Sequence, residues 1–332
     1  MRRALLLVTG LSLILAVALA AIAWHWTHRP LPLPRTPYDF EIRSGASLAS
    51  VARQLRDDGV LMHPMMLVGL ARLHAADRSI KAGSYELDAG VTLEQLLQKL
   101  TQGDVTQASL TIVEGTTFNE LKRALRENPQ LQKTVLDLPD AELLAQVGVA
   151  APHPEGQFFP DTYFFAVGSR DVDLLRRAHR ALAARLATAW ERRAPDLPLR
   201  TPYEALILAS IVEKETGRPA DRPLVASVFA NRLRQGMRLQ TDPTVIYGLG
   251  ERFDGNLRKR DLESDTPYNT YTREGLPPTP IALPSQAALD AATRPPASEY
   301  LYFVSRGDGS SAFSATLADH NRAVARFQRG AR

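Results

Sequence analysis

The feature that most constrains this chain is an apolar run at its N-terminus. Ala4–Ala23 is a stretch of 20 residues without a charged side chain. As a helix it is long enough to cross the hydrocarbon core of a bilayer, which is about 30 Å thick. Arg2 and Arg3 precede the run, so the positive-inside rule predicts a cytoplasmic N-terminus. We therefore expect a single-pass anchor at 4–24 in the cytoplasmic (inner) membrane, with the bulk of the chain periplasmic or otherwise extracytoplasmic.

Two other interpretations of the run remain open. Ala18-Leu-Ala20 resembles the small-residue cleavage site of a signal peptide, which would make the run a removable leader. A buried core helix is a poorer explanation for so long an uncharged run. The length of the run favours the anchor, and so do Trp24 and Trp26, which follow it where an interfacial aromatic belt is expected.

Composition excludes several classes of function. The 332 residues include no cysteine, which excludes disulfides, thiolate zinc sites and a cysteine nucleophile. The seven histidines form no His-x-x-x-His pair, so we predict neither a metal nor another cofactor. A net charge of +4 suits anionic membrane surfaces or anionic polymers and does not indicate a nucleic-acid partner.

Four further segments can be predicted, besides the anchor. Residues 1–3 form a cytoplasmic tail, and 25–37 form a proline-rich linker that should be extended. Residues 38–104 read as a small α/β module, and 105–332 as a larger domain of mixed helices and strands. The fold class expected for the whole chain is therefore α+β.

The module at 38–104 begins with a strand, a turn and a helix. Ser47 is the expected cap of that helix, and apolar residues follow it at helical spacing. The run Glu41–Ala52 resembles the start of a LysM domain, a family that binds glycans containing N-acetylglucosamine. A generic strand-turn-helix unit explains the same residues.

In the larger domain, Glu204–Gly217 predicts an apolar helix that ends in two carboxylates, Glu213 and Glu215. Successive residues turn by about 100°, so these two side chains point to nearly opposite sides. Glu215 continues the apolar side of the helix, where lost solvation raises the pKa of a carboxyl group. That condition suits a general acid. The alternative is an ordinary solvated helix end.

Three polar and aromatic segments follow this helix. Sugar binding needs flat aromatic faces together with amide and hydroxyl groups. These segments offer that mixture, and the candidate substrate-binding residues are Gln240, Thr241, Asp242, Tyr247, Tyr268, Asn269 and Tyr271. Buried tyrosines that only satisfy their hydroxyl groups remain an alternative.

Several motifs together resemble the YceG/MltG family of endolytic murein transglycosylases. They are Glu155–Tyr163, Ala209–Thr216, Asn231-Arg-Leu, Leu239–Val245, Tyr268–Tyr271, Gly275-Leu-Pro-Pro278 and Tyr300–Val304. The likeness runs from the predicted anchor to the C-terminus, and it adds weight to the LysM-like interpretation of the module.

The resemblance implies cleavage of the β-1,4 bond between N-acetylmuramic acid and N-acetylglucosamine inside peptidoglycan strands, including nascent glycan. The muramic 6-hydroxyl replaces water as the nucleophile and leaves a 1,6-anhydro end. One carboxyl group can serve this reaction as acid and then as base. Glu215 is the catalytic candidate and Glu213 the runner-up.

Two competing functions stay open. If Asp242 faces Glu215, a pair of carboxylates would allow hydrolysis by a muramidase. A membrane-anchored scaffold that binds peptidoglycan without catalysis is the alternative from another class. The expected partners are peptidoglycan glycan strands and the bilayer; cell-wall synthesis proteins are conceivable partners, but the sequence names none.

Overall fold

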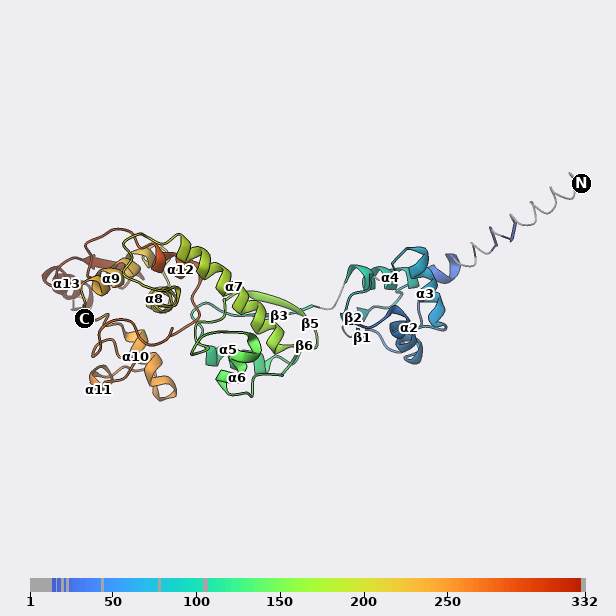
Figure 1. Cartoon of the computed structure of the whole chain (residues 1–332), viewed down its shortest axis with the longest axis horizontal. Helices are drawn as coiled ribbons and strands as arrows, with labels where there is room; N and C mark the ends of the chain where they lie inside the picture. Colours follow the sequence, from blue (N-terminus) through green and yellow to red (C-terminus); the bar gives the residue numbers. More distant parts are fainter. Residues whose placement is uncertain are drawn as a thin grey trace, which may run out of the picture. The chain divides into compact units, whose positions relative to one another are not determined.

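The computed structural model describes residues 14–15, 17–18, 21, 24–42, 45–76, 79–103 and 107–329. The predicted tail at 1–3 and most of the predicted anchor at 4–24 lie outside these residues. Within the part that is described, no helix combines the length and the apolar character needed to span a membrane. The chain divides into two compact units (Figure 1). Unit 1 is Met1–Ala108 with Phe164–Gly168, and unit 2 is Ser109–Tyr163 with Ser169–Arg332.

Between residues 38 and 103, the described part of unit 1 contains two strands and three helices. In chain order they are β1 (Tyr38–Ile42), α2 (Leu48–Asp57), α3 (Pro64–Leu73), β2 (Gly83–Leu87) and α4 (Leu93–Gln102). The two strands are antiparallel, with Phe40 opposite Tyr85. The predicted cap of α2 is confirmed, because the Ser47 side chain accepts a hydrogen bond from the Ser50 N–H. Thr92 and Gln95 form a capping box at the start of α4.

Unit 1 has its own hydrophobic core, in which the stacked rings of Phe40 and Tyr85 meet buried residues of all three helices. The linker, which was expected to be an extended segment, also contributes to this core. The Leu31 N–H donates to the Val91 carbonyl over 2.8 Å, and Leu31 and Leu33 pack against the core. Leu31 and Leu33 explain this contact, because burying their apolar side chains is favourable.

Unit 2 begins with a region of short strands and helices. Its elements are β3 (Gln107–Thr111), α5 (Phe118–Glu127), β4 (Leu131–Gln132), α6 (Asp140–Val147), β5 (Thr162–Ala166), β6 (Ser169–Arg170) and α7 (Asp171–Glu191). Strand β3 pairs with β5, and β4 pairs with β6 in parallel. Thr117 and Glu120 form a capping box at the start of α5. The boundary between unit 1 and unit 2 falls within strands β3 and β5.

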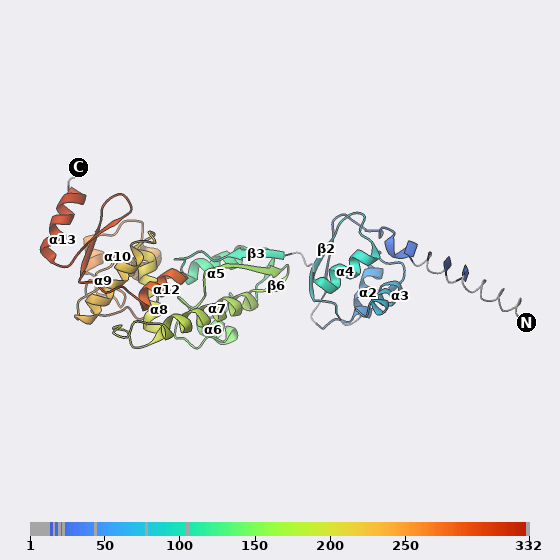
Figure 2. The ribbon, with the colours of Figure 1, turned by 90° about the horizontal axis from the view of Figure 1, so that it is seen from above.

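The rest of unit 2 is mainly helical and holds the residues of interest. Its elements are α8 (Pro202–Glu215), α9 (Arg222–Arg234), α10 (Asp242–Leu249), η1 (Gly250–Arg252), α11 (Lys259–Glu263), α12 (Gln286–Thr293), β7 (Tyr302–Ser305), β8 (Ser311–Ser314), α13 (Leu317–Val324) and η2 (Ala325–Arg329). Helices α8, α9 and α12 pack together (Figures 1 and 2). Strands β7 and β8 form the predicted hairpin. The mixture of helices and strands is an α+β fold.

Helix α8 is the apolar helix expected from Glu204–Gly217, and it is buried on every side. Every residue from Ala205 to Val212 is buried. Even Ser210 is fully buried; its hydroxyl donates to the Ile207 carbonyl and accepts from the Ile281 N–H. A helix that is apolar all round is typical of a core, and here α7, α9 and α12 supply the surrounding layers.

Candidate active site

The C-terminal end of α8 presents two glutamates to different surroundings. Thr201 caps the start of the helix by accepting a hydrogen bond from the Glu204 N–H, and Pro202 follows at the first helical position. The helix ends at Glu215, and Thr216 is already extended. Glu213 and Glu215 are therefore held on a rigid element and leave it in different directions.

Glu213 points into the packed interior. One of its carboxylate oxygens accepts from the Arg222 guanidinium over 3.3 Å, and the other accepts from the backbone N–H and the hydroxyl of Ser285. Its side chain is only 6% exposed. Glu213 thus joins the end of α8 to the first turn of α9 and to the start of α12. Its charge is balanced by a neighbouring cation.

Glu215 is partly buried and faces a different set of neighbours. Its Oε2 accepts a hydrogen bond from the Thr241 hydroxyl over 2.7 Å. Burial raises the pKa of Glu215, and the negative charge of Asp242 raises it further, while the bond from Thr241 acts in the opposite direction. The proton is therefore retained to higher pH than on an ordinary glutamate, as a general acid requires.

Glu215 lies at the wall of a cleft of about 600 Å³ in unit 2. Helix α9 and the loop before α10 line one part of the cleft, and β7, β8 and α13 line another part. The lining side chains are Glu215, Arg232, Leu239, Gln240, Asp242, Tyr271, Tyr302, Phe303, Val304, Ser305, Ser311, Leu317, His320, Val324 and Gln328. The volume lies within the range of small-molecule and sugar sites.

Buried Arg232 holds the loop that carries three predicted site residues. Its guanidinium donates to the carbonyls of Arg238 and Leu239 and to the side-chain oxygen of Gln240. Gln240 has φ of +52°, a left-handed conformation that is unfavourable for residues with a Cβ. Such backbone is typical of functional sites, where surrounding bonds maintain it. Here the result is a fixed position for Thr241, whose hydroxyl bonds to Glu215.

Asp242 lies in the first turn of α10 and shares the cleft with Glu215. Its carboxylate accepts a hydrogen bond of 2.6 Å from the Tyr271 hydroxyl. Burial and the neighbouring Asp242 raise the pKa of Tyr271 well above its ordinary value. The cleft therefore contains two carboxyl groups, Glu215 and Asp242.

Four predicted substrate-binding residues, Thr241, Tyr247, Tyr268 and Asn269, are not among the side chains that line this cleft, although Thr241 contacts Glu215. The Asn269 side chain is fully buried, donates to the carbonyls of Asp261, Leu262 and Ser264, and accepts from the Tyr271 N–H. Tyr268 bonds to the Thr279 hydroxyl over 2.9 Å. The expectation that these residues share a cleft with Glu215 is not met, because their polar groups satisfy the loops around them.

Tyr247 also lies apart from the cleft, and it leads to a carboxyl group that sequence reasoning passed over. Its hydroxyl donates over 3.1 Å to Glu155, which also accepts from the Phe118 N–H. Glu155 is 2% exposed, and burial raises its pKa to about 7. It belongs to the Glu155–Tyr163 motif, but nothing in the motif alone shows that the carboxyl group is buried.

The cleft also contains residues that the sequence left without a role. The Tyr302 ring stacks on His320 at 5.2 Å between centroids, and the Arg232 guanidinium lies 5.1 Å from the same ring. Burial, with Arg232 nearby, lowers the pKa of His320. In the sequence, Arg232 and Tyr302 stood out as members of the motifs Asn231-Arg-Leu and Tyr300–Val304. These two motifs meet only through folding.

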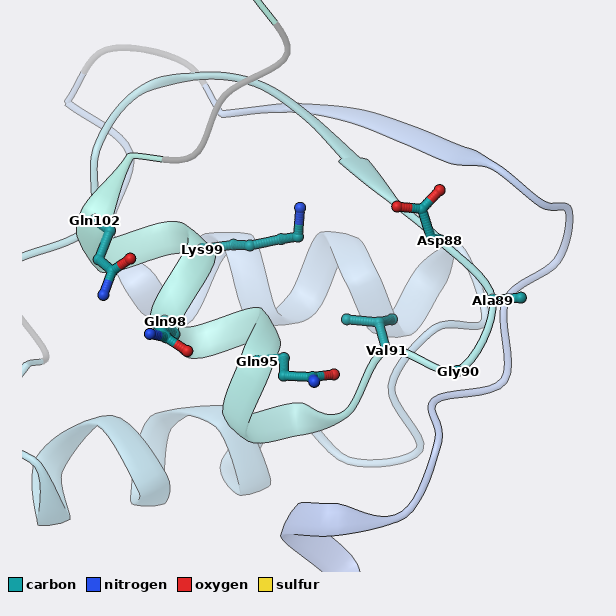
Figure 3. A pocket seen from close by; sticks show the side chains of 8 residues that line it. All are labelled: Asp88, Ala89, Gly90, Val91, Gln95, Gln98, Lys99 and Gln102. Atoms are coloured by element: carbon teal, nitrogen blue, oxygen red, sulfur yellow. The ribbon is translucent and has the colours of Figure 1, made fainter.

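A second cavity lies in unit 1 and is separate from Glu215. It measures about 470 Å³ and combines the turn Asp88–Val91 with the polar side of α4, where Gln98 and Gln102 project (Figure 3). Across the residues that the structure describes, no cluster of three or more histidine or acidic side chains could hold a metal ion. The two cavities offer carboxyl and amide groups, with hydroxyl groups, Arg232 and His320 in the cleft and Lys99 in unit 1.

Comparisons with known proteins agree on one family. The profile described as the YceG-like family matches residues 40–326. The endolytic murein transglycosylase of Bacillus subtilis (strain 168) is 32% identical over 313 residues, covering 88% of this chain and 85% of that protein. The protein of the same name from Streptococcus pneumoniae is 27% identical over 86% of this chain and 57% of its own length.

A solved structure gives the same result. The crystal structure of a YceG-like protein from Listeria monocytogenes matches with a TM-score of 0.54 and 31% identity, and the match covers 86% of this chain and 99% of that chain.

Proposed function

Because the chain belongs to the YceG-like family, we propose that it is an endolytic murein transglycosylase, the activity for which its relatives from Bacillus and Streptococcus are named. It cleaves the β-1,4 bond between N-acetylmuramic acid and N-acetylglucosamine inside peptidoglycan strands. The observation that carries this proposal is Glu215, a carboxyl group of raised pKa at the rigid end of α8, facing a cleft of about 600 Å³.

In the proposed reaction Glu215 acts first as an acid. It gives its proton to the glycosidic oxygen as the bond from that oxygen to C1 of the muramic sugar breaks. The resulting carboxylate then takes the proton of the muramic 6-hydroxyl, whose oxygen bonds to C1 and closes the 1,6-anhydro ring. Glu215 ends protonated, as it began, and no water is consumed. Thr241 orients the carboxyl group through its hydrogen bond to Oε2.

The second carboxyl group of the cleft, Asp242, makes hydrolysis a specific alternative reaction. If Asp242 activated water, the products would carry reducing ends. The hydrogen bond from Tyr271 engages only one oxygen of the Asp242 carboxylate, so the products of the reaction decide between transglycosylase and hydrolase.

The test is to digest purified glycan strands with the full chain in detergent and to analyse the products by mass spectrometry and by strand length. Anhydro ends and a rapid fall in mean strand length are expected. Reducing ends alone would overturn the lytic mechanism, and release of terminal disaccharides alone would overturn the endolytic one. Full activity in Glu215→Gln would overturn the assignment of Glu215 as the acid, and absence of any cleavage by the parent chain would leave the scaffold without catalysis as the better function.

We also propose that 4–24 anchor the chain in the inner membrane, with the N-terminus in the cytoplasm, that 38–104 form a LysM-like glycan-binding module, and that 105–332 form the catalytic domain. The uncharged run Ala4–Ala23 supports the anchor. The module is supported by the strand-turn-helix of β1 and α2, and by the amide groups of Gln98 and Gln102 (Figure 3). Flotation with vesicles tests the anchor. Binding to insoluble peptidoglycan by Gln98→Ala/Gln102→Ala, in a Glu215→Gln background, tests the module.

A further inference from the structure

We propose that the outer side of α3 in unit 1 lies on the surface of the lipid bilayer. This inference rests on the proposed membrane anchor and adds a second contact between the protein and the membrane. We call the surface the α3 stripe, and it consists of Met62, Met65, Gly69 and Leu73.

The α3 stripe is apolar and exposed. Met62, Met65 and Leu73 are 60%, 67% and 83% exposed. Met65, Gly69 and Leu73 follow one another at four-residue spacing on one side of α3, Met62 lies just before the helix, and Gly69 has open space beside its Cα. The other side of α3, including Leu67 and Leu70, supplies the core of unit 1. Single exposed apolar side chains are ordinary, but a row of large ones on one helix indicates an interaction surface.

The N-terminal segment fixes the α3 stripe close to the predicted anchor. Trp26, Arg29 and Pro30 line a small cavity of about 150 Å³ together with Met62 and Met66, at the beginning of α3. The linker is tied there by the bridge between Pro30 and Thr92. In both views α3 lies on the side of unit 1 where the helix at 24–28 joins it, and β1 and β2 lie on the other side (Figures 1 and 2).

The short distance along the chain between the proposed anchor and unit 1 favours the bilayer as the surface that covers the α3 stripe. Trp24 is 65% exposed and directly follows the uncharged run Ala4–Ala23, at the expected level of the lipid headgroups. From Trp24 to Pro30 the chain can span about 20 Å when extended, and about 10 Å as a helix. With the proposed anchor in place, unit 1 therefore begins within about 10–20 Å of the membrane, whereas a protein partner would first have to be recruited.

Charge supports the same occupant. The sequence from Gly59 to Ala76 contains no acidic residue. Arg72 is exposed beside Leu73, and Arg29 lies at the other end of the α3 stripe. Asp58 and Asp77 flank this stretch in the sequence, and Glu94 lies 3.6 Å from the His74 ring. A surface of methionine, leucine and arginine suits the interface of an anionic bilayer.

The absence of cysteine from the sequence permits a direct test. The full chain, with a polarity-sensitive fluorophore on Met65→Cys or Leu73→Cys, is reconstituted in phosphatidylcholine–phosphatidylglycerol vesicles. The matched control is Gln102→Cys, exposed at the end of α4 opposite Val91 (Figure 3). Emission from positions 65 and 73 should move to shorter wavelength. Nitroxide lipids should quench those two positions more strongly than position 102, on the order of twofold, because only the α3 stripe enters the interface.

A second variant separates docking from anchoring. Met65→Glu/Leu73→Glu, labelled at Met62→Cys, should still float with vesicles but should lose the shift to shorter wavelength. Flotation with equal quenching at positions 65, 73 and 102 would overturn the docking and leave the anchor in place. A chain that does not float at all would overturn the anchor, and docking with it. Neither result would change the proposed chemistry of Glu215, which is measured separately on soluble glycan.

Discussion

The two sides of the end of α8 show how one helix can prepare two glutamates for different tasks. On the packed side, Glu213 has Arg222 as a counter-charge and two donors from Ser285. On the cleft side, Glu215 has one neutral donor, Thr241, and the negative Asp242. Glu213 is strongly buried, so burial does not distinguish the pair. The difference lies in the partner: a cation makes one carboxylate structural, and its absence from the contacts of the other leaves a proton to donate.

The largest effect should come from Glu215→Gln. The amide cannot donate a proton as an acid or accept one as a base, so glycan cleavage should fall by about 10³-fold. Folding should be kept, because Thr241 can donate to the amide oxygen. Strand cleavage and thermal unfolding are measured together. Glu274→Gln, on an exposed loop, is the control and should match the parent. A comparable loss of glycan cleavage in Glu274→Gln would contradict a specific catalytic role of Glu215.

Glu213→Gln should act on stability. Removing one partner of a buried ion pair costs about 3–5 kcal/mol, since Arg222 is left without its counter-charge. The melting temperature should drop by about 10 °C. Below that temperature the cleavage rate per folded molecule should stay far above that of Glu215→Gln. A variant that is stable but inactive would instead assign the acid to Glu213.

Glu155 sharpens the comparison, because it is buried without a counter-charge but outside the cleft. Its folded pKa of about 7 lies above the unfolded value of 4.5. The protonated carboxyl group of Glu155 stabilises the fold relative to the unfolded chain. This contribution is complete below pH 4.5 and is lost as pH rises towards 7, a change of about 3 kcal/mol in the free energy of unfolding. Glu155→Gln should flatten this part of the stability profile, measured by denaturant unfolding. Exposed Glu142→Gln should keep the parent's slope.

The smallest effects should be opposite shifts in the pH profile of cleavage. Activity should decline as pH rises through the pKa of Glu215, because the acid loses its proton. Thr241→Val removes the hydrogen bond that lowers this pKa, so the decline should move to higher pH; Thr241→Ser keeps the hydroxyl and should not shift it. Asp242→Asn removes a charge that raises the pKa, so the decline should move to lower pH. Shifts in the same direction would contradict the assigned environment.

Local signals in the sequence predicted much of the fold. Ser47 was expected to cap α2, and its side-chain oxygen accepts a backbone N–H there; Thr92 and Thr117 cap α4 and α5 in the same way. These features depend on residues within a few positions of each other, where the sequence carries the information directly.

Features that depend on distant residues were not predictable in the same way. The pattern of α8 indicated a helix with two different sides, but whether a side is solvated depends on α12, more than 70 residues later. Asn269 has the composition of a sugar ligand and instead ties its own loop together. Arg232 meets Tyr302 only through the tertiary fold. Side-chain chemistry indicated which groups could bind a sugar, and tertiary packing determined which of them reach the cleft.

The backbone of Gln240 has a consequence for attempts to make this protein more heat-resistant. A left-handed residue with a Cβ invites replacement by glycine, which relieves about 1 kcal/mol of strain. That replacement would also remove the amide to which Arg232 donates. An engineered Gln240→Gly chain would trade orientation of Thr241 for a higher tolerance of temperature. Position 240 should therefore be left unchanged in any thermostabilised design that has to keep its rate.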